Sequence, residues 1–348
     1  MDSTIEVQGK QLKLSNLEKV LYPATGFTKQ QVIDYYVRIA PAMLPHLTGR
    51  ALTRKRYPNG VDAEFFYEKN APQHRPDWVK TAPIWSEGNH RTVHYILADD
   101  LPTLVWLANL AAIELHPSLA LAKDITCPTT MVFDLDPGPA ANMVQCCQVG
   151  IWLREIFDHF GLQSFPKTSG SKGLQIYVPL NTPTKYEFTK TFAHALAQLL
   201  EQQHPQMVVS DMKKSLRAGK VFVDWSQNDE HKTTVAVYSL RARERPTVST
   251  PVSWDEVEHA LRKKDANRLV FEAPQTVSRV EKMWDLFAPV LKLKQRLPDL
   301  TAVAGSAAGE TEAPISLAAQ AEEAPKKARR RAVKKVAKPR TRKAARKV

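Results

Sequence analysis

Apolar and polar residues follow one another along the first 300 residues in patterns that predict both helices and strands. A capping box, Thr28-Lys29-Gln30-Gln31, begins a helix whose apolar residues recur at helical spacing to about Met43. The same periodicity predicts helices over residues 101–115, 142–160, 186–202 and 277–287. Runs of β-branched and apolar residues predict strands over residues 130–135, 175–180, 220–225 and 233–238. Because helices and strands do not alternate regularly, the pattern indicates a mixed α/β body and not a doubly wound fold.

The composition excludes several classes of protein. The 348 residues are 43% hydrophobic and 24% charged, which is typical of a globular chain, and no apolar run approaches the length of a membrane-spanning helix. The three cysteines, Cys127, Cys146 and Cys147, are too few and too irregularly spaced for a disulfide scaffold or a zinc finger. The N-terminus lacks the basic and apolar stretches of a secretory signal, so we expect a cytoplasmic protein without a membrane partner.

The net charge of +13 is concentrated at the C-terminus. Residues 325–348 contain 13 Lys and Arg and no acid, residues 301–324 contain four Glu and no base, and residues 1–300 carry a net charge of +4. We therefore expect a folded body over 1–300, a flexible linker over 301–324 and a disordered basic tail over 325–348. The tail favours sequence-independent binding of DNA or RNA in the nucleoid. The alternative is a solubilising segment without a specific partner.

Three aspartates lie on predicted strands in positions that suit metal ions. Asp134 and Asp136 end one strand, and because side chains alternate along a strand they lie on the same face. Asp224 interrupts the apolar run VFVDW, where a carboxylate is costly unless it is paired or bound to a metal. Hard divalent ions bind such oxygen ligands, and a pair of ions promotes nucleotidyl transfer. The alternative for the first two aspartates is a surface Asp-x-Asp at a turn.

The segment KTSGSKGL, residues 167–174, lies between these strands and predicts a phosphate-binding loop. Its glycines let the backbone approach a ligand closely, its serines and backbone amides can bind phosphate oxygens, and Lys172 supplies positive charge. The spacing of a Walker A loop is absent. The alternative is an ordinary hairpin turn.

Taken in order, these motifs resemble the polymerase domain of bacterial ligase D, a member of the archaeo-eukaryotic primase superfamily. The resemblance covers about residues 5–297. The matching segments are NLEKVLYP (16–23), TRKRYPNG (53–60), IELH (113–116), FDLDPG (133–138), TSGSKGL (168–174), KSLRAGKVFVDWSQN (214–228) and YSLRAR (238–243). It implies an α+β catalytic core of mainly antiparallel sheets flanked by helices.

The resemblance also implies an activity and partners. The activity is template-dependent addition of nucleotides to gaps and ends of DNA in non-homologous end joining, with two Mn²⁺ or Mg²⁺ ions and a preference for ribonucleotides. The implied partners are DNA with gaps or double-strand breaks, NTPs or dNTPs, a Ku-type protein and a separate DNA ligase. The alternative function is a catalytically weakened DNA-end-binding scaffold for that ligase. An architectural protein driven by the basic tail would leave the aspartates without a use.

Site residues follow from the resemblance, motif by motif. Asp134, Asp136 and Asp224 would bind the metal ions and carry catalysis. The implied nucleotide-binding residues are His116, Ser169, Lys172, Gln175, Gln227 and Arg241. The implied DNA-binding residues are Lys19 and Lys29 at a 5′-phosphate, Lys55 at the template backbone, Phe66 and Tyr67 as a base-stacking pair, and Arg217 in a primer loop; residues 85–97 correspond to a second primer loop. Without the resemblance, His116 is typical of a helix end, and Phe66 and Tyr67 are typical of a strand packed in the core.

Gln175 departs from the family pattern, in which the loop runs Ser-Gly-x-Lys-Gly-Leu-His and the histidine contacts the triphosphate. Glutamine can donate a hydrogen bond, but it cannot carry a positive charge. We therefore predict that Gln175→His raises kcat/KM for the nucleotide in steady-state primer extension. An unchanged kcat/KM would contradict this prediction.

Overall fold

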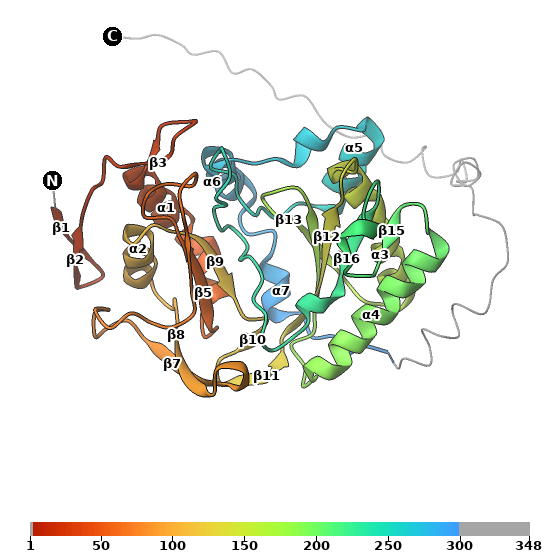
Figure 1. Ribbon diagram of the computed structural model, residues 1–348, viewed down its shortest axis with the longest axis horizontal. Coiled ribbons are helices and arrows are strands. Elements are labelled where there is room, and N and C mark those ends of the chain that lie inside the picture. The colour runs from red at the N-terminus through yellow and green to blue at the C-terminus, as the bar shows by residue number, and fades with distance from the viewer. Residues whose placement is uncertain (1–2, 299–348) are drawn as a thin grey trace, which may run out of the picture. The chain divides into compact units, whose positions relative to one another are not determined.

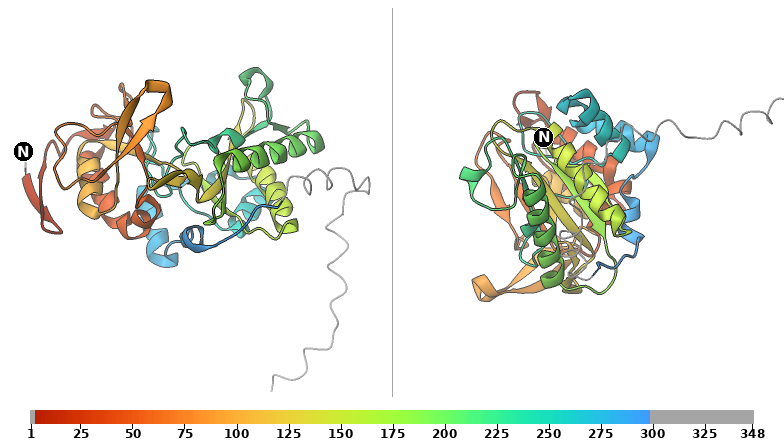
Figure 2. Two further views of the ribbon diagram at one scale, coloured as in Figure 1. Left: turned by 90° about the horizontal axis from the view of Figure 1, so that it is seen from below. Right: turned by 90° about the vertical axis from the view of Figure 1, so that its right-hand side faces the viewer.

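The computed structural model of the chain describes residues 3–298 (Figures 1 and 2). The predicted linker (301–324) and basic tail (325–348) lie outside the described residues, and both stay predictions. Two five-stranded sheets form the framework of the described part, and helices pack against each of them. Within residues 3–298 no helix is both long enough and apolar enough to cross a membrane.

The first sheet contains strands from the N-terminal part of the chain, and all of its strand pairs are antiparallel. Its strands are β5 (Leu52–Arg56), β6 (Phe66–Glu68), β7 (Thr81–Ser86), β8 (Arg91–Ile96) and β9 (Ala112–Pro117). Two helices, α1 (Lys29–Leu47) and α2 (Leu101–Asn109), pack against each other on this half, and α2 contacts β9 (Figure 1).

The second sheet has the order β13-β14-β12-β16-β15 and is antiparallel except for the parallel pair β15 and β16. Its strands are β12 (Thr130–Pro137), β13 (Phe165–Thr168), β14 (Leu174–Pro179), β15 (Val208–Val209) and β16 (Val221–Asp224). Helices α3 (Met143–His159) and α4 (Tyr186–Gln203) pack against this sheet. The predicted α+β class with mainly antiparallel sheets is confirmed.

The remaining elements are short. Three two-stranded pairs are β1–β2 (Ser3–Val7, Lys10–Leu14), β3–β4 (Val20–Tyr22, Phe27–Thr28) and β10–β11 (Ala120–Leu121, Asp124–Pro128). The further helices are α5 (Trp254–Lys263), α6 (Ala273–Met283) and α7 (Ala288–Lys292), with the 3₁₀ turns η1 (Glu87–Asn89), η2 (Lys214–Leu216), η3 (Trp225–Gln227) and η4 (Ala266–Leu269).

Alternation along β12 separates two hydrophobic cores. Met131, Phe133 and Leu135 are buried in the core that contains α3 and α4. Val132 points to the opposite face and belongs to the core of the first half, together with Tyr177 of β14. Since residues two apart lie on one face of a strand, Asp134 and Asp136 continue the face of Val132. The aspartates therefore lie on the face of the second sheet that is turned away from α3 and α4.

Several predicted elements are confirmed. The Thr28–Gln31 capping box begins α1, and Asn142 caps α3 in the same way. The strands predicted over 130–135, 175–180 and 220–225 correspond to β12, β14 and β16, and the helix predicted over 186–202 corresponds to α4. Cys146 and Cys147 are buried in α3 as small apolar residues.

The helix predicted over 101–115 is wrong in its second half. The helix α2 ends at Asn109, Ala111 has a left-handed φ of 55°, and β9 begins at Ala112. Both α2 and most of β9 are buried, so apolar residues run continuously through both, and such a run carries no periodicity that separates a helix from a strand.

Two further predictions need correction. Residues 233–238 form no strand, although Ala236 N–H donates to the carbonyl of Leu115 at 2.8 Å and the segment runs beside β9. The regular ladder is broken because Leu115 N–H donates to the Ser239 hydroxyl, at 3.0 Å, and not to a backbone carbonyl. The helix predicted over 277–287 corresponds to α6, which ends at Met283. Pro289 does not follow a helix end but lies in the first turn of α7.

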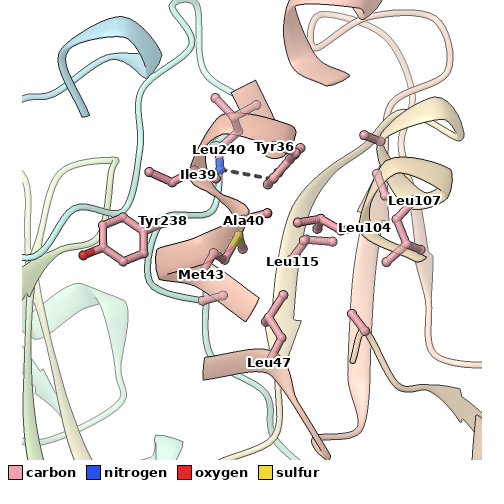
Figure 3. Close-up of a cluster of buried hydrophobic side chains, with 14 of the residues drawn as sticks. Tyr36, Ile39, Ala40, Met43, Leu47, Leu104, Leu107, Leu115, Tyr238 and Leu240 are labelled. Carbon is pink, nitrogen blue, oxygen red and sulfur yellow. Dashed lines mark hydrogen bonds between the residues drawn. The ribbon is translucent and has the colours of Figure 1, made fainter. Parts of the chain in front are cut away.

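Tyr36 joins three parts of the first core (Figure 3). Its side chain is fully buried in α1, and its hydroxyl donates to the carbonyl of Ile113 at 2.6 Å and accepts from the N–H of Leu240 at 3.2 Å. Around it, apolar side chains of α1, α2 and β9 form the core; they include Ile39, Met43, Leu47, Leu104, Leu107 and Leu115. Tyr36 thereby ties α1 to β9 and to the segment that follows Tyr238.

We predict that Tyr36→Phe lowers the free energy of unfolding by about 1–3 kcal/mol, because it leaves a buried N–H and a buried carbonyl without the hydroxyl. Urea denaturation followed by circular dichroism measures the change. The control is Tyr67→Phe, whose hydroxyl is exposed and which should change stability by less than about 0.5 kcal/mol. Equal stability of wild type and Tyr36→Phe would contradict the prediction.

Candidate active site

Four polar side chains form a row across the second sheet. Asp134 of β12 is paired with Gln175 of β14 on one side and with Asp224 of β16 on the other. Gln175 is in turn paired with Lys167 of β13. Directly paired residues have their side chains on the same face of a sheet, so the row and Asp136 share one face. The structure thus brings together the three aspartates that the sequence predicts as metal ligands.

The three carboxylates repel one another. Burial, followed by the charge of Asp136 and then that of Asp224, raises the pKa of Asp134 to about 7. The pKa of Asp136 is also raised, by burial and by Asp224, although Arg217 and Arg241 oppose the shift. The carboxylates therefore outweigh the positive groups nearby, and a bound cation would relieve the remaining repulsion.

The side chains present fit a divalent cation. Asp134 Oδ1 is buried and has no hydrogen-bond partner among the described residues, which leaves one ligand oxygen uncommitted. Both oxygens of Asp224 are oriented: Ser226 N–H and Oγ donate to Oδ1 at 2.9 and 2.5 Å, and Gln227 Nε2 donates to Oδ2 at 2.8 Å. Across residues 3–298, no three His, Cys, Asp or Glu side chains already converge on one point, so a cation would have to draw the aspartates together.

Lys167 is a fully buried lysine beside this row. Its ammonium donates to Gln175 Oε1 at 2.5 Å and to Ser249 Oγ at 2.6 Å. With its oxygen held by Lys167, the Gln175 amide has its NH₂ group free to turn toward Asp134. A histidine at position 175 would lie between this lysine and Asp134, the two residues with which Gln175 is paired.

The segment 169–173, called the phosphate loop below, is the turn between β13 and β14. Ser169 Oγ accepts hydrogen bonds from the N–H groups of Ser171 and Gly173, at 3.2 and 3.1 Å, and so orders the loop itself. A Cβ at Gly173 would lie 2.2 Å from Leu135 O, so only glycine allows the loop to approach the end of β12. Lys172 is exposed, and within residues 3–298 its ammonium has no hydrogen-bond partner.

A second charged cluster is centred on Glu114 of β9. His116 Nε2 lies 2.9 Å from Glu114 Oε2, and Arg241 Nε lies 3.3 Å from Glu114 Oε1. Arg241 Nη1 also donates to the carbonyl of Ser169. The cluster brings the predicted nucleotide-binding residues His116 and Arg241 together at Glu114, and Arg241 links it to the phosphate loop. The alternative position of His116 at a helix end is wrong, because it lies in a strand.

The residues predicted to bind a 5′-phosphate meet near β3 and β4. Lys29 N–H donates to the carbonyl of Lys19 at 2.8 Å, so the two residues are adjacent in space. Lys19 is exposed, and its ammonium donates to Asn59 Oδ1 at 2.9 Å. Lys29 is buried, and its ammonium donates to the carbonyl of Ser15 at 2.5 Å. Only Lys19 presents its charge to solvent in this structure.

Phe66 and Tyr67 lie on the edge strand β6 and are 49% and 54% exposed. The alternative that they pack in the core is therefore wrong, and exposed aromatic rings suit base stacking. Lys55 of β5 is paired with Tyr67, and its ammonium lies 4.3 Å from the ring centroid of Phe65 and 3.6 Å from Glu114 Oε2.

The two predicted primer loops have different structures. Residues 85–97 are mainly the second strand of the β7–β8 hairpin, with η1 at its tip, and not an irregular loop. Trp85 is 54% exposed there and borders a cavity of about 300 Å³ with Tyr95 and His231. Arg217 lies between β15 and β16 and contacts the end of β12, since a Cβ at Gly138 would lie 1.8 Å from its carbonyl oxygen.

Lys167 and Glu114 were missed by the sequence analysis. Glu114 interrupts a buried apolar run, and the argument that singled out Asp224 applies equally to it, because a buried carboxylate needs a partner. Lys167 begins the KTSGSKGL segment, but no local pattern shows that a lysine at the end of an edge strand is fully buried.

We predict that Asp134→Asn stabilises the metal-free protein, raising the melting temperature by about 2–5 °C at pH 8. Because the pKa of Asp134 is raised in the folded protein, ionisation of this carboxyl group destabilises the fold. The wild type should therefore lose stability as the pH rises through about 7. The gain should accordingly shrink at pH 5. Thermal denaturation with and without MnCl₂ measures both effects, and Mn²⁺ should stabilise the wild type but not Asp134→Asn.

The matched control is Asp229→Asn, because Asp229 is paired with Lys190 at 2.7 Å. This substitution should not raise the melting temperature and should preserve the response to Mn²⁺. A lower melting temperature for Asp134→Asn at pH 8 would refute the repulsion argument.

Comparison with known proteins agrees with this geometry. The family model described as "LigD, primase-polymerase domain" matches residues 28–287. The chain is 42% identical over 283 residues to the multifunctional non-homologous end joining protein LigD of Mycolicibacterium smegmatis, and 34% identical over 251 residues to the bifunctional LigD of Bacillus subtilis. These matches cover 81% and 72% of this chain but only 36% and 40% of the relatives.

A solved structure supports the same assignment. The polymerase domain of Mycobacterium tuberculosis ligase D in complex with DNA is 40% identical in sequence, with a TM-score of 0.75. The match covers 82% of this chain and 99% of that one. The extent of these matches shows that the chain belongs to the LigD primase-polymerase family, whose members are metal-dependent nucleotidyltransferases.

Proposed function

We propose that this chain adds nucleotides, under the direction of a DNA template, to primer ends at gaps and breaks during non-homologous end joining. One observation carries the proposal: three aspartates share a sheet face directly beside a glycine-containing loop that suits phosphate. A Cβ at Gly173 would lie 3.5 Å from Asp136 Oδ1, so the phosphate loop and the carboxylates form one site. This is the combination that transfer of a nucleotidyl group requires.

Within this proposal each group has a distinct role. Two divalent cations, Mn²⁺ or Mg²⁺, held by Asp134, Asp136 and Asp224 would activate the primer 3′-hydroxyl and neutralise charge on the leaving pyrophosphate. Ser226 and Gln227 orient Asp224 for this task. On the other side, Lys172, Arg241 and His116 bind the triphosphate of an NTP or dNTP. A guanidinium group is suited to phosphate oxygens because it can form two parallel hydrogen bonds.

The DNA contacts that we propose surround this site. Lys19, with Lys29, binds the 5′-phosphate at the downstream side of a gap, and the exposed rings of Phe66 and Tyr67 stack on template bases. Lys55 and Arg217 add positive charge near the template and the primer. Ribonucleotide preference and cooperation with a Ku-type protein and a separate ligase follow from the end-joining relatives, and they are part of the proposal.

The test is primer extension on a short gapped duplex that has a downstream 5′-phosphate, with ribonucleotides or deoxyribonucleotides and with Mn²⁺ or Mg²⁺. We expect the wild type to extend the primer, fastest with ribonucleotides and Mn²⁺. We expect Asp134→Ala/Asp136→Ala to lose at least about 100-fold in rate, because removal of the carboxylates removes the cations. The control Asp158→Ala removes an exposed carboxylate of α3 and should extend normally.

Binding of the same gapped DNA is measured in parallel. If neither the wild type nor the double variant extends the primer while both bind the DNA, the polymerase proposal fails and the end-binding scaffold takes its place.

A further inference from the structure

We propose that Glu114 is the positioning residue of the nucleotide site: its buried carboxylate holds His116 and Arg241 in the places from which they bind the triphosphate. The inference rests on the proposed function, because the nucleotide comes from it. Glu114 is neither a predicted metal ligand nor a predicted nucleotide ligand, so its role acts through other residues.

The carboxylate contacts groups from three separate segments. Nε2 of His116 and the N–H of Ala242 donate to it at 2.9 and 3.0 Å, and Nε of Arg241 and the ammonium of Lys55 lie 3.3 and 3.6 Å from it; Lys55 is paired with Glu114 across β5 and β9. The Glu114 side chain is 3% exposed. Burial alone would raise the pKa of Glu114, but the hydrogen bond from His116 and the charges of Arg241 and Lys55 outweigh burial and lower it. Glu114 is therefore ionised at neutral pH.

Glu114 sets the tautomer of His116. A carboxylate only accepts hydrogen bonds, so the Nε2 atom that lies 2.9 Å from it carries the proton. Burial lowers the pKa of His116, although Glu114 opposes the shift, which favours a neutral ring at pH 7. In this neutral ring Nδ1 only accepts hydrogen bonds. It donates to a phosphate oxygen once the ring gains a second proton, a change that the charges of Glu114 and of the triphosphate both favour.

Glu114 also fixes both the backbone and the side chain of Arg241. Its Oε1 atom faces Arg241 Nε, and the same atom accepts from the next backbone N–H, that of Ala242. On the other side, the hydroxyl of Tyr22 donates to the carbonyl of Arg241 at 3.0 Å. With Nη1 bound to Ser169 O, the guanidinium spans from β9 of the first sheet to the phosphate loop of the second.

The buried carboxylate of Glu114 reduces the repulsion between the positive groups of the nucleotide site. A triphosphate needs several positive groups close together, and such groups repel one another before the nucleotide arrives. A buried carboxylate between them lowers this repulsion and spares the site a rearrangement on binding. Loss of the charge should therefore weaken nucleotide binding and leave DNA binding unchanged.

Equilibrium binding of a fluorescent ATP analogue with MnCl₂ tests the inference without requiring catalysis. We expect Glu114→Gln to raise the Kd for the analogue about tenfold, since the charge-assisted hydrogen bond to His116 and the ion pair with Arg241 are both lost. Glu114→Asp, whose carboxylate is one methylene shorter, should not restore the wild-type Kd. The Kd for gapped DNA should stay within twofold of the wild-type value.

The control is Glu256→Gln, which removes the carboxylate of a two-bond ion pair with Arg279, at 2.6 and 2.9 Å, between α5 and α6. It should lower the melting temperature and leave the Kd for the analogue unchanged. A double-mutant cycle separates positioning from general stability. If Glu114 acts through Arg241, then Glu114→Gln adds less than twofold to the Kd of Arg241→Ala, whereas independent roles would multiply the two losses.

The wild-type protein provides a test that needs no substitution. Long-range ¹⁵N NMR of the imidazole should show His116 as the Nε2–H tautomer, and an Nδ1–H tautomer would overturn the inference. So would an unchanged Kd for Glu114→Gln or a wild type that binds no nucleotide. A wild type that binds the analogue in a Glu114-dependent manner but extends no primer would refute the proposed function and leave this inference standing.

Discussion

The repulsion between three carboxylates on two adjacent strands is the constraint on which the rest of the structure depends. Asp134 and Asp224 are direct partners in the β12–β16 ladder, so the backbone hydrogen bonds of the sheet hold their charges together. The sheet can sustain this because its other face, with Phe133 and Leu135, is fully buried beneath α3 and α4. Hydrophobic burial on one face thus stabilises an arrangement that is unfavourable on the other, as is common at functional sites.

The opposite arrangement occurs on the first sheet. There a single carboxylate, Glu114, is surrounded by the side chains of His116, Arg241 and Lys55. The two sheets therefore present complementary electrostatic fields. The aspartates of the second sheet attract cations, and the cluster at the first sheet attracts anions. A nucleotide bound to metal ions has both kinds of charge, and Arg241, which reaches the phosphate loop, links the two fields.

Sequence-based prediction of this site succeeded where chemistry shows in local patterns. The alternation in FDLDPG and the acid within VFVDW placed the three aspartates correctly, because a strand defines the direction of each side chain. It failed where burial hides periodicity, as at the boundary between α2 and β9. It also missed Lys167, whose burial depends on Gln175 and on Ser249, 82 residues away, so no window of sequence could reveal it. The exposure of Phe66 and Tyr67 likewise depends on β6 being an edge strand, which only the assembled sheet determines.

The C-terminal part of the described chain binds segments from much earlier in the sequence. Asp285 accepts from Tyr238, which precedes the segment of Arg241, and lies 2.8 Å from His46 of α1. Gln295 then binds Gln163 and the carbonyl of Pro179 at the end of β14. These contacts set a limit on how genes for this enzyme can be fused or split in evolution. A junction placed before Asp285 would remove the contacts that hold Tyr238 and the segment of Arg241. A junction placed after Leu297 would keep the contacts of Asp285 and Gln295, so other modules could be joined there or separated there without disturbing the fold.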